Sequence, residues 1–432
     1  MLNLITNLPN HLKVTISAWI ARGIIAITNL IAIRFLLPYL GTESYAVYLI
    51  LLSFTSWCAL TDFGIGTALQ NYISEFRVKK IDYQPYINSA FQIIICFTLI
   101  AIMLSLVLYQ PIQNFILKKY TDILNIQTIN VVLASLILLI LIGVVNISTK
   151  IYYALQKGVI PNILTSIAYI ISFCAMLIVI NTQSENNKIL KIILCYTLPQ
   201  IVLIGFLFFK IFKNSIKNIF KVNKDILKVL LDRTIKFGLI TIIGLMNYEI
   251  DYFIMAKTVS PTDITVYSVF AKIFLAVFSI YSSLLIAFWP LCAERYHRKE
   301  YKEIKEHINR YLIFGISLLS VSIIILYLFK DLIFSILLQN ISYNLSYTFF
   351  IVAIIYFIFR TIGDTYTIFL QSTNHTKIFI TFISIQTFIN IYLQYYFSLK
   401  FGITGIFLGL ALSYLFTQTL FFPYISYRIL RN

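Results

Sequence analysis

The chain has 432 residues, of which 59% are hydrophobic and 12% are charged, whereas a soluble globular protein carries roughly 25% charged residues. This composition excludes a water-soluble fold, because no such core could enclose so much apolar side chain. The formal net charge is +17, but the basic residues cluster in short loops between apolar runs, so they indicate membrane topology rather than nucleic-acid binding.

Apolar runs of about twenty residues must form helices in a membrane, since the backbone there has to satisfy its own hydrogen bonds. The alternation of apolar and polar residues that is typical of a membrane β-barrel is absent. We therefore predict an all-α integral membrane protein with about twelve transmembrane helices. The expected spans cover residues 14–37, 45–63, 87–109, 129–153, 161–181, 189–209, 237–257, 265–289, 311–330, 347–370, 378–398 and 403–425.

The distribution of Lys and Arg predicts the orientation. If both termini are cytoplasmic, 23 of these residues lie in the inner segments and 8 in the outer ones. The positive-inside rule therefore places both termini in the cytoplasm.

The basic stretch 210–236 divides the chain into two sets of about six spans. Apolar residues alternate with its lysines, which predicts an amphipathic cytoplasmic linker. We expect an N-terminal six-helix bundle over 1–209 and a C-terminal one over 237–432. A repeated Leu-Gln pair, at Gln156 and Gln371, favours two pseudo-symmetric bundles around a central cavity.

The cysteines and histidines do not indicate a bound group. All five cysteines lie in or at the end of apolar runs, and the four histidines lie in loops without a ligand partner at metal spacing. We therefore expect neither a metal site nor a cofactor.

Several short motifs resemble a known family. They are the segments LGTESY at 40–45, LTDFGIGTALQN at 60–71, YALQKG at 153–158, DYFI at 251–254 and FWPL at 288–291. Together they resemble the polysaccharide flippases, the Wzx-type O-antigen exporters. Ala46 departs from the glycine that this family often has, but alanine is also small enough for close helix packing.

The resemblance implies the fold of the multidrug/oligosaccharidyl-lipid/polysaccharide exporter superfamily. It also implies that the chain moves a polyprenyl-diphosphate-linked oligosaccharide from the cytoplasmic to the periplasmic leaflet of the bacterial inner membrane. Membrane lipids, a polysaccharide polymerase and glycosyltransferases are then the expected partners.

Basic residues inside the predicted spans are candidates for substrate binding, because a charge there normally faces a cavity or pairs with another charge. A diphosphate carrying sugars needs cationic donors and hydroxyl or amide groups along its path. Pairs of such residues share a helix face in the first and fourth spans. The candidates are Arg22, Asn29, Asn146, Lys150, Lys272 and Arg360.

Structural roles compete with these functional ones. Arg22 could pair with a neighbouring helix, whereas Lys150 and Lys272 could extend to the membrane interface. Arg360 and Asp364 are four residues apart, so they could neutralise each other.

Carboxylates in the spans are candidates for ion coupling. One that loads and releases a proton or sodium ion could favour one of two transport states over the other, and the alternative is a structural hydrogen bond. The coupling candidates are Glu249, Asp251 and Asp364. A hinge or cap at the end of the second span is expected at Asp62, Gly64 and Gly66.

Two other functions compete with the flippase. A cation-coupled exporter of small molecules would usually have acidic and aromatic residues for cationic drugs, whereas the basic residues here favour an anionic substrate. A membrane polymerase or glycosyltransferase would need a sizeable catalytic loop, yet the longest outer segment, near 110–128, offers only Lys118, Lys119 and Asp122. We therefore predict a transport protein rather than an enzyme.

Overall fold

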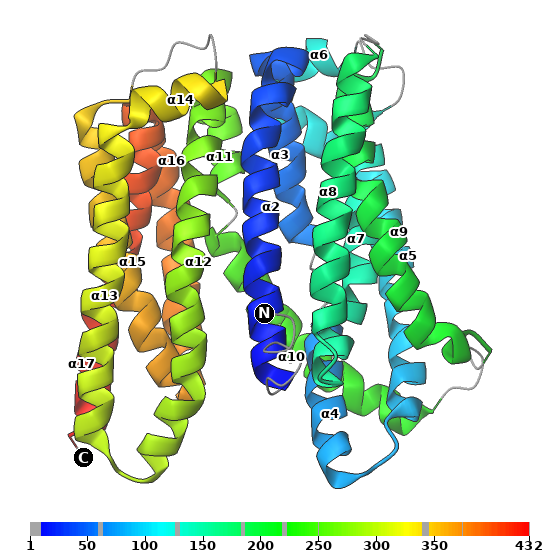
Figure 1. Cartoon of the computed structure of the whole chain (residues 1–432), viewed down its shortest axis with the longest axis vertical. Coiled ribbons are helices and arrows are strands. Elements are labelled where there is room, and N and C mark those ends of the chain that lie inside the picture. The colour runs from blue at the N-terminus through cyan, green and yellow to red at the C-terminus, as the bar shows by residue number, and fades with distance from the viewer. Residues whose placement is uncertain are drawn as a thin grey trace, which may run out of the picture. The chain divides into compact units, whose positions relative to one another are not determined.

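The computed structural model describes residues 10–58, 64–125, 130–182, 186–217, 223–248, 250–338, 345–373 and 375–431. Within these ranges the chain consists of helices joined by turns and loops, without a β-strand. The all-α class predicted from the composition is therefore confirmed. The chain divides into two compact units, Met1–Ile242 and Ile243–Asn432, and Figure 1 shows the helices of each.

Unit 1, residues 1–242, is a bundle of long apolar helices (Figure 1). Among its candidate membrane-spanning helices α7 is the most buried, with 61% of its most apolar stretch buried. Helix α2 packs along α8, and α9 packs along both α7 and α8. The elements are α2 (Asn10–Leu40), α3 (Thr42–Cys58), α4 (Ile65–Lys79), α5 (Gln84–Ile116), η2 (Lys118–Tyr120), α6 (Thr121–Asn125), α7 (Val131–Ala154), α8 (Val159–Asn181), α9 (Lys188–Lys217) and α10 (Lys224–Tyr248), whose last turn belongs to unit 2.

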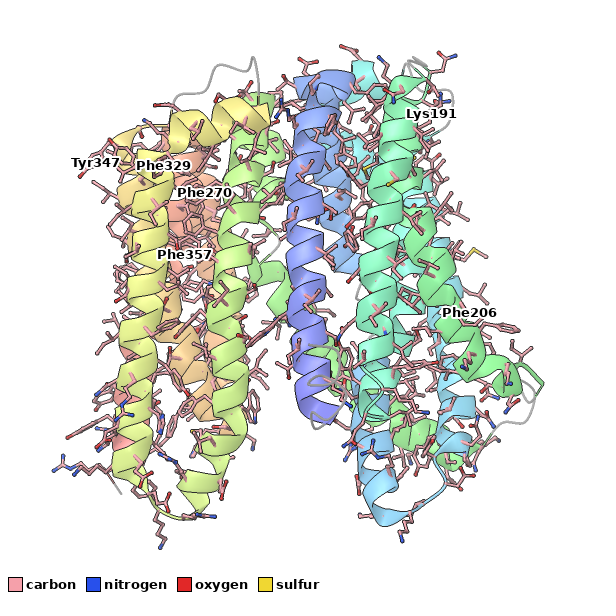
Figure 2. The ribbon with its side chains drawn as sticks, in the orientation of Figure 1. Lys191, Phe206, Phe270, Phe329, Tyr347 and Phe357 are labelled. Carbon is pink, nitrogen blue, oxygen red and sulfur yellow. The ribbon has the colours of Figure 1, made fainter. Side chains whose placement is uncertain are left out.

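Unit 2, residues 243–432, packs around α15, which contacts α12, α13 and α16. Its core is rich in aromatic rings, and Figure 2 shows Phe270 and Phe357 among its helices, with Tyr347 towards one end. The elements are α11 (Asp251–Thr258), α12 (Pro261–His297), α13 (Tyr301–Leu328), α14 (Lys330–Leu338), α15 (Tyr347–Ser372), α16 (Thr376–Tyr414), η3 (Leu415–Thr419) and α17 (Leu420–Ile429).

Nine helices of the described residues are long and apolar enough to span a membrane. The predicted spans 378–398 and 403–425 fall within one of these, because α16 continues through a sharp bend at Gly402. Gly402 has a φ of +57°, a conformation that glycine adopts at little steric cost. Beyond the bend, Gly405 and Gly409 lie against the backbone of Phe397 and Gln394, where a Cβ atom would overlap the backbone. These glycines let the two arms of α16 approach closely.

The predicted seventh span, 237–257, is interrupted. Helix α10 ends at Tyr248 and α11 begins at Asp251. A hydropathy window averages over such a break, because the residues on both sides are apolar. The nine-residue helix α14, which lies across one end of unit 2 in Figure 1, was also not predicted, since it is too short to span a membrane.

The basic segment 210–236 forms parts of two helices. Residues 210–217 complete α9, and residues 224–236 form the first half of α10. Leu230 and Thr234 are buried, whereas Lys224 and Lys228 are exposed. The Arg233 guanidinium lies 4.2 Å from the centre of the Tyr72 ring on α4. This cation–π contact ties α10 to α4 within unit 1.

Candidate functional site

In unit 1, three helices meet at a polar cluster around Asn162, at the beginning of α8. The Tyr153 hydroxyl, on α7, donates to Oδ1 of Asn162. The Asn162 amide in turn donates to Ser17 Oγ at 2.9 Å and to the Val14 carbonyl at 3.3 Å, both on α2. Because Asn162 is buried, these hydrogen bonds satisfy an amide that would otherwise be costly to enclose.

The turn after α7 explains why a glycine stands at position 158. A Cβ atom there would lie 2.6 Å from the Tyr153 ring and 2.9 Å from a methyl group of Val14. Gly158 therefore leaves room for the ring that reaches Asn162. The Tyr153 hydroxyl also lies within electrostatic reach of Arg22, which is exposed on α2.

The other candidates of unit 1 lie on α7 and α2. The Lys150 ammonium donates to Thr67 Oγ1 of α4 at 3.3 Å, which joins α7 to the segment that carries the LTDFGIGTALQN motif. Asn146 is exposed on α7, and Asn29 is half-buried on α2. Among the described residues, Arg22 forms no ion pair.

The predicted cap of the second span is partly described. Gly64 precedes α4 with a φ of +83°, which suits glycine, and Gly66 is buried in the first turn of that helix. Asp62 lies outside the described residues, as does the coupling candidate Glu249.

Unit 2 contains a partly open cavity of about 330 Å³. It brings together three of the predicted candidates, Asp251, Lys272 and Arg360. The other lining residues are mostly aromatic, with two amides, and they come from α10, α11, α12, α15 and α16: Asn247, Tyr252, Tyr267, Phe270, Ala271, Phe274, Leu275, Phe278, Tyr356, Phe357, Gln394, Phe407 and Leu410.

Asp251 is held in the wall of this cavity by two donors. The Tyr267 hydroxyl of α12 donates to Oδ2, and the Tyr252 backbone N–H donates to Oδ1 at 2.9 Å. Asp251 is only 9% exposed and begins α11 directly after the interruption of the seventh span. A buried carboxylate in a cavity wall can bind a proton or a cation.

A row of amides continues the polar wall. The Asn390 amide donates to the carbonyl and to Oδ1 of Asn247, at 3.0 and 3.2 Å. The Gln394 amide donates to Asn390 Oδ1 at 2.9 Å. These bonds fix the orientation of the Asn247 and Gln394 side chains. They leave Asn247 Nδ2 and Gln394 Oε1 buried without a partner among the described residues. Each unsatisfied atom costs about 1–3 kcal/mol.

The two cations of the cavity differ in their surroundings. The Arg360 Nε lies 3.4 Å from Asp364 Oδ2, its Nη1 donates to the Tyr356 hydroxyl at 3.1 Å, and its guanidinium lies 4.0 Å from the Phe278 ring centre. Lys272 makes no hydrogen bond or ion pair with any described residue. Asp364 neutralises Arg360, whereas Lys272 is available to an anion.

Several site residues were not predicted, namely Tyr267, Asn390, Gln394 and Asn162. The sequence contained a signal for one pair, because Asn390 and Gln394 are four residues apart in an apolar span and so share a helix face. Tyr267 and Asn162 carried no such signal, since their partners come from other helices.

Three relatives match nearly the full length of the chain, and a family model matches part of its second half. The family model of MatE matches residues 237–396. A Salmonella typhi protein named "Putative O-antigen transporter" is 31% identical over 416 residues, 96% of this chain and 95% of that one. A Salmonella typhimurium protein of the same name is 33% identical over 418 residues, 95% of each chain. A Yersinia pseudotuberculosis "Putative O-antigen export protein" is 28% identical over 419 residues, 96% of this chain and 95% of that one.

Solved structures share the fold. The lipid II flippase MurJ, in an inward closed conformation, aligns with a TM-score of 0.68 and 15% identity, over 96% of this chain and 87% of that one. An inward-facing multidrug resistance MATE family transporter of the MOP superfamily aligns with a TM-score of 0.64 and 13% identity, over 96% of this chain and 99% of that one. At such identities the likeness establishes the fold alone.

Proposed function

Because this chain belongs to the O-antigen transporter family, we propose that it is a flippase for polyprenyl-diphosphate-linked oligosaccharides. It moves the lipid-linked glycan from the cytoplasmic to the periplasmic leaflet of the bacterial inner membrane. This direction is the one that the resemblance to the O-antigen exporters implies, because surface polysaccharide is assembled outside the cell. A polysaccharide polymerase and glycosyltransferases are the partners that would use and supply such a substrate.

The observation that carries this proposal is a pair of uncompensated cations. Arg22 in unit 1 and Lys272 in unit 2 lie on membrane-spanning helices, and among the described residues neither forms an ion pair. A cation in a span needs water or an anionic partner. A diphosphate headgroup supplies that partner, since its oxygens accept charge-assisted hydrogen bonds.

Arg22→Ala tests the proposal in a deletion strain. The variant, expressed at the wild-type level, should leave surface polysaccharide at about one tenth of the wild-type amount or less, the loss expected when one charge-assisted contact is removed. Arg34→Ala on the same helix is the matched control, because Arg34 lies near the predicted outer end of the span. Full restoration by Arg22→Ala would remove Arg22 from the mechanism.

Ion coupling is assigned to Asp251. Its carboxylate lies at the interruption between α10 and α11, in the same cavity wall as the unsatisfied Gln394 oxygen. Binding of a proton or sodium ion there can drive transport only if the two transport states bind that ion differently. Glu249 and Asp364 have weaker support, since Glu249 is outside the described residues and Asp364 pairs with Arg360.

A cation-coupled exporter of small molecules is the second candidate. The aromatic lining of the unit 2 cavity favours it, because aromatic rings bind organic cations. Lys272 opposes it, since an unpaired ammonium repels a cationic drug. Broad drug resistance in a strain that overexpresses the chain would favour this second function over the flippase.

A further inference from the structure

We propose that one end of unit 2 binds the headgroup of an anionic glycerophospholipid. The site lies between the beginning of α13 and the end of α17, and Figure 1 shows both segments near the C-terminus of the chain. Both belong to candidate membrane spans, Tyr301–Leu328 and Lys377–Ile429, so these ends lie at the level of the lipid headgroups. The inference is independent of the proposed function, because it concerns a resident lipid and not the transported one.

Two cations at this end are held on aromatic rings of α17. The Lys305 ammonium of α13 lies 5.2 Å from the centre of the Tyr427 ring, and the Arg428 guanidinium lies 4.7 Å from the centre of the Tyr424 ring. Neither cation forms an ion pair with any residue that the structure describes. A cation on an aromatic face keeps its charge and its N–H donors, so both side chains are available to an anion.

The other arginines around the start of α13 already have acidic partners. The pairs are Arg295 with Glu303, Arg298 with Glu294, and Arg310 with Glu306. These ion pairs take up acidic groups that would otherwise neutralise Lys305 or Arg428. Glu300, the fourth acidic residue between positions 294 and 310, forms no ion pair with either cation in the described part of the chain. Positive charge therefore remains on the surface shared by α13 and α17.

A packed core holds the two helices together beneath this surface. Ile304 and Ile308 of α13 are buried in one hydrophobic cluster with Phe422 of α17. Ile304 directly precedes Lys305 in the chain, so the backbone that carries this cation is anchored in the core. The two cations are thus positioned before a ligand arrives, which lowers the entropic cost of binding.

The face of α17 that leads to Arg428 is apolar and exposed. Leu420, Phe421 and Tyr424 are 53%, 44% and 54% exposed, respectively. Leu420, Tyr424 and Arg428 are each four residues apart, so they share one face of the helix. Leu420 and Arg428 lie about 12 Å apart along the helix axis. An acyl chain attached to a phosphate bound at Arg428 therefore runs along this apolar face.

Other occupants match the surface less well. The ammonium group of a zwitterionic lipid adds a positive charge beside Lys305 and Arg428, where both cations already lack an acidic partner. Free phosphate binds the cations but leaves the apolar face uncovered. A symmetric dimer through this face would bring the same two cations of each copy together.

The test measures single-lipid binding to the purified full-length protein in detergent by native mass spectrometry. We expect phosphatidylglycerol to bind about tenfold more tightly than phosphatidylcholine, because interface cations attract only the lipid with a net negative charge. Inorganic phosphate at equal concentration should not displace phosphatidylglycerol, since it makes no apolar contact. This comparison needs no variant.

Variants assign the selectivity to this surface. Lys305→Gln/Arg428→Gln should weaken phosphatidylglycerol binding about tenfold and leave phosphatidylcholine binding unchanged. Arg298→Gln/Arg310→Gln is the matched control, because it removes the same formal charge from the same end of unit 2 but only from acid-paired arginines. It should bind as the wild type does.

A third variant separates a built site from net charge. Tyr427→Leu keeps every charge of the chain but removes the ring on which Lys305 lies. It should weaken phosphatidylglycerol binding about threefold, the loss expected when one cation–π contact no longer holds the ammonium in place. Wild-type binding by this variant would mean that the ring does not position Lys305.

Four further results would overturn the proposal. They are equal affinity of the wild type for the two lipids, wild-type affinity of Lys305→Gln/Arg428→Gln for phosphatidylglycerol, equal weakening by the two double variants, and a dimer that forms in place of lipid binding. None of them would bear on the flippase function, which is tested separately by the leaflet in which the lipid-linked glycan accumulates.

Discussion

Tyr267 of α12 donates its hydroxyl to the carboxylate of Asp251, the first residue of α11. The contact holds the carboxylate in the cavity wall at the place where the seventh span is interrupted. It also joins two helices of unit 2, so a change in the protonation or ion occupancy of Asp251 alters a contact between them. This is the kind of local change that can be linked to a difference between transport states.

Asp251→Asn should abolish the response of transport to an ion gradient, because an amide has nearly the same shape but cannot bind a proton or balance a cation. We expect gradient-driven uptake to fall by about tenfold or more while exchange without a gradient persists. Uptake into proteoliposomes under imposed proton and sodium gradients measures both. Asp263→Asn at the N-terminus of α12 is the matched control, and a wild-type response of Asp251→Asn would exclude Asp251 from coupling.

Gly409→Ala should destabilise unit 2. A Cβ atom at Gly409 would lie 2.5 Å from the Gln394 backbone nitrogen, and overpacking of this kind costs about 1–3 kcal/mol. Thermal unfolding in detergent should therefore show a lower midpoint. Gly23→Ala is the control, since a Cβ atom at that position would have no neighbour within 4 Å. Equal midpoints for the two variants would show that the arms of α16 separate at little cost.

Tyr153→Phe and Asn162→Ala should act through one hydrogen bond. Each removes a partner of the contact between α7 and α8, so each single variant should lose transport activity. The double variant should lose no more than the worse single one, with a coupling energy of about 1 kcal/mol. The measurement is a double-mutant cycle, in which the transport rates of the wild type, the two single variants and the double variant are compared. Additive losses would mean that the two side chains act independently.

Arg360 and Asp364 should behave as a structural pair. Removing only Arg360, as in Arg360→Met, leaves a poorly solvated carboxylate, and loss of one partner of a buried pair costs about 3–5 kcal/mol. Because these side chains are 15% and 18% exposed, we expect the lower end of that range. The double variant Arg360→Met/Asp364→Leu should recover most of the stability in a thermal assay. If the double variant were as unstable as Arg360→Met, the loss of stability would not come from the unpaired Asp364 carboxylate.

Much of the fold could be predicted from hydropathy. The expected span 161–181 corresponds to α8 at Val159–Asn181, and the expected span 347–370 corresponds to α15 at Tyr347–Ser372. The comparisons confirm the predicted family and the prediction of a transport protein rather than an enzyme. The interruption before Asp251 and the bend at Gly402 could not be located, because both depend on local backbone geometry that a window of twenty residues averages out.

The candidate site could be predicted only in part. Charges in apolar spans are conspicuous, so the sequence predicts Asp251, Lys272 and Arg360 as candidates, and all three line the cavity of unit 2. The sequence spacing allows Arg360 to pair with Asp364, but whether it does so depends on the rotamers of both side chains. The unsatisfied atoms of Asn247 and Gln394 depend on the position of Asn390, which only the packing of α10 against α16 determines. The predicted linker and central cavity remain predictions.

The leaflet in which the lipid-linked glycan accumulates tests the central proposal most directly. In a deletion strain, leaflet-resolved detection should find the glycan in the cytoplasmic leaflet, and re-expression of the wild-type chain should return it to the periplasmic leaflet. Arg22→Ala should leave it in the cytoplasmic leaflet. A deletion strain whose glycan reaches the periplasmic leaflet as it does in the wild type would contradict the flippase function.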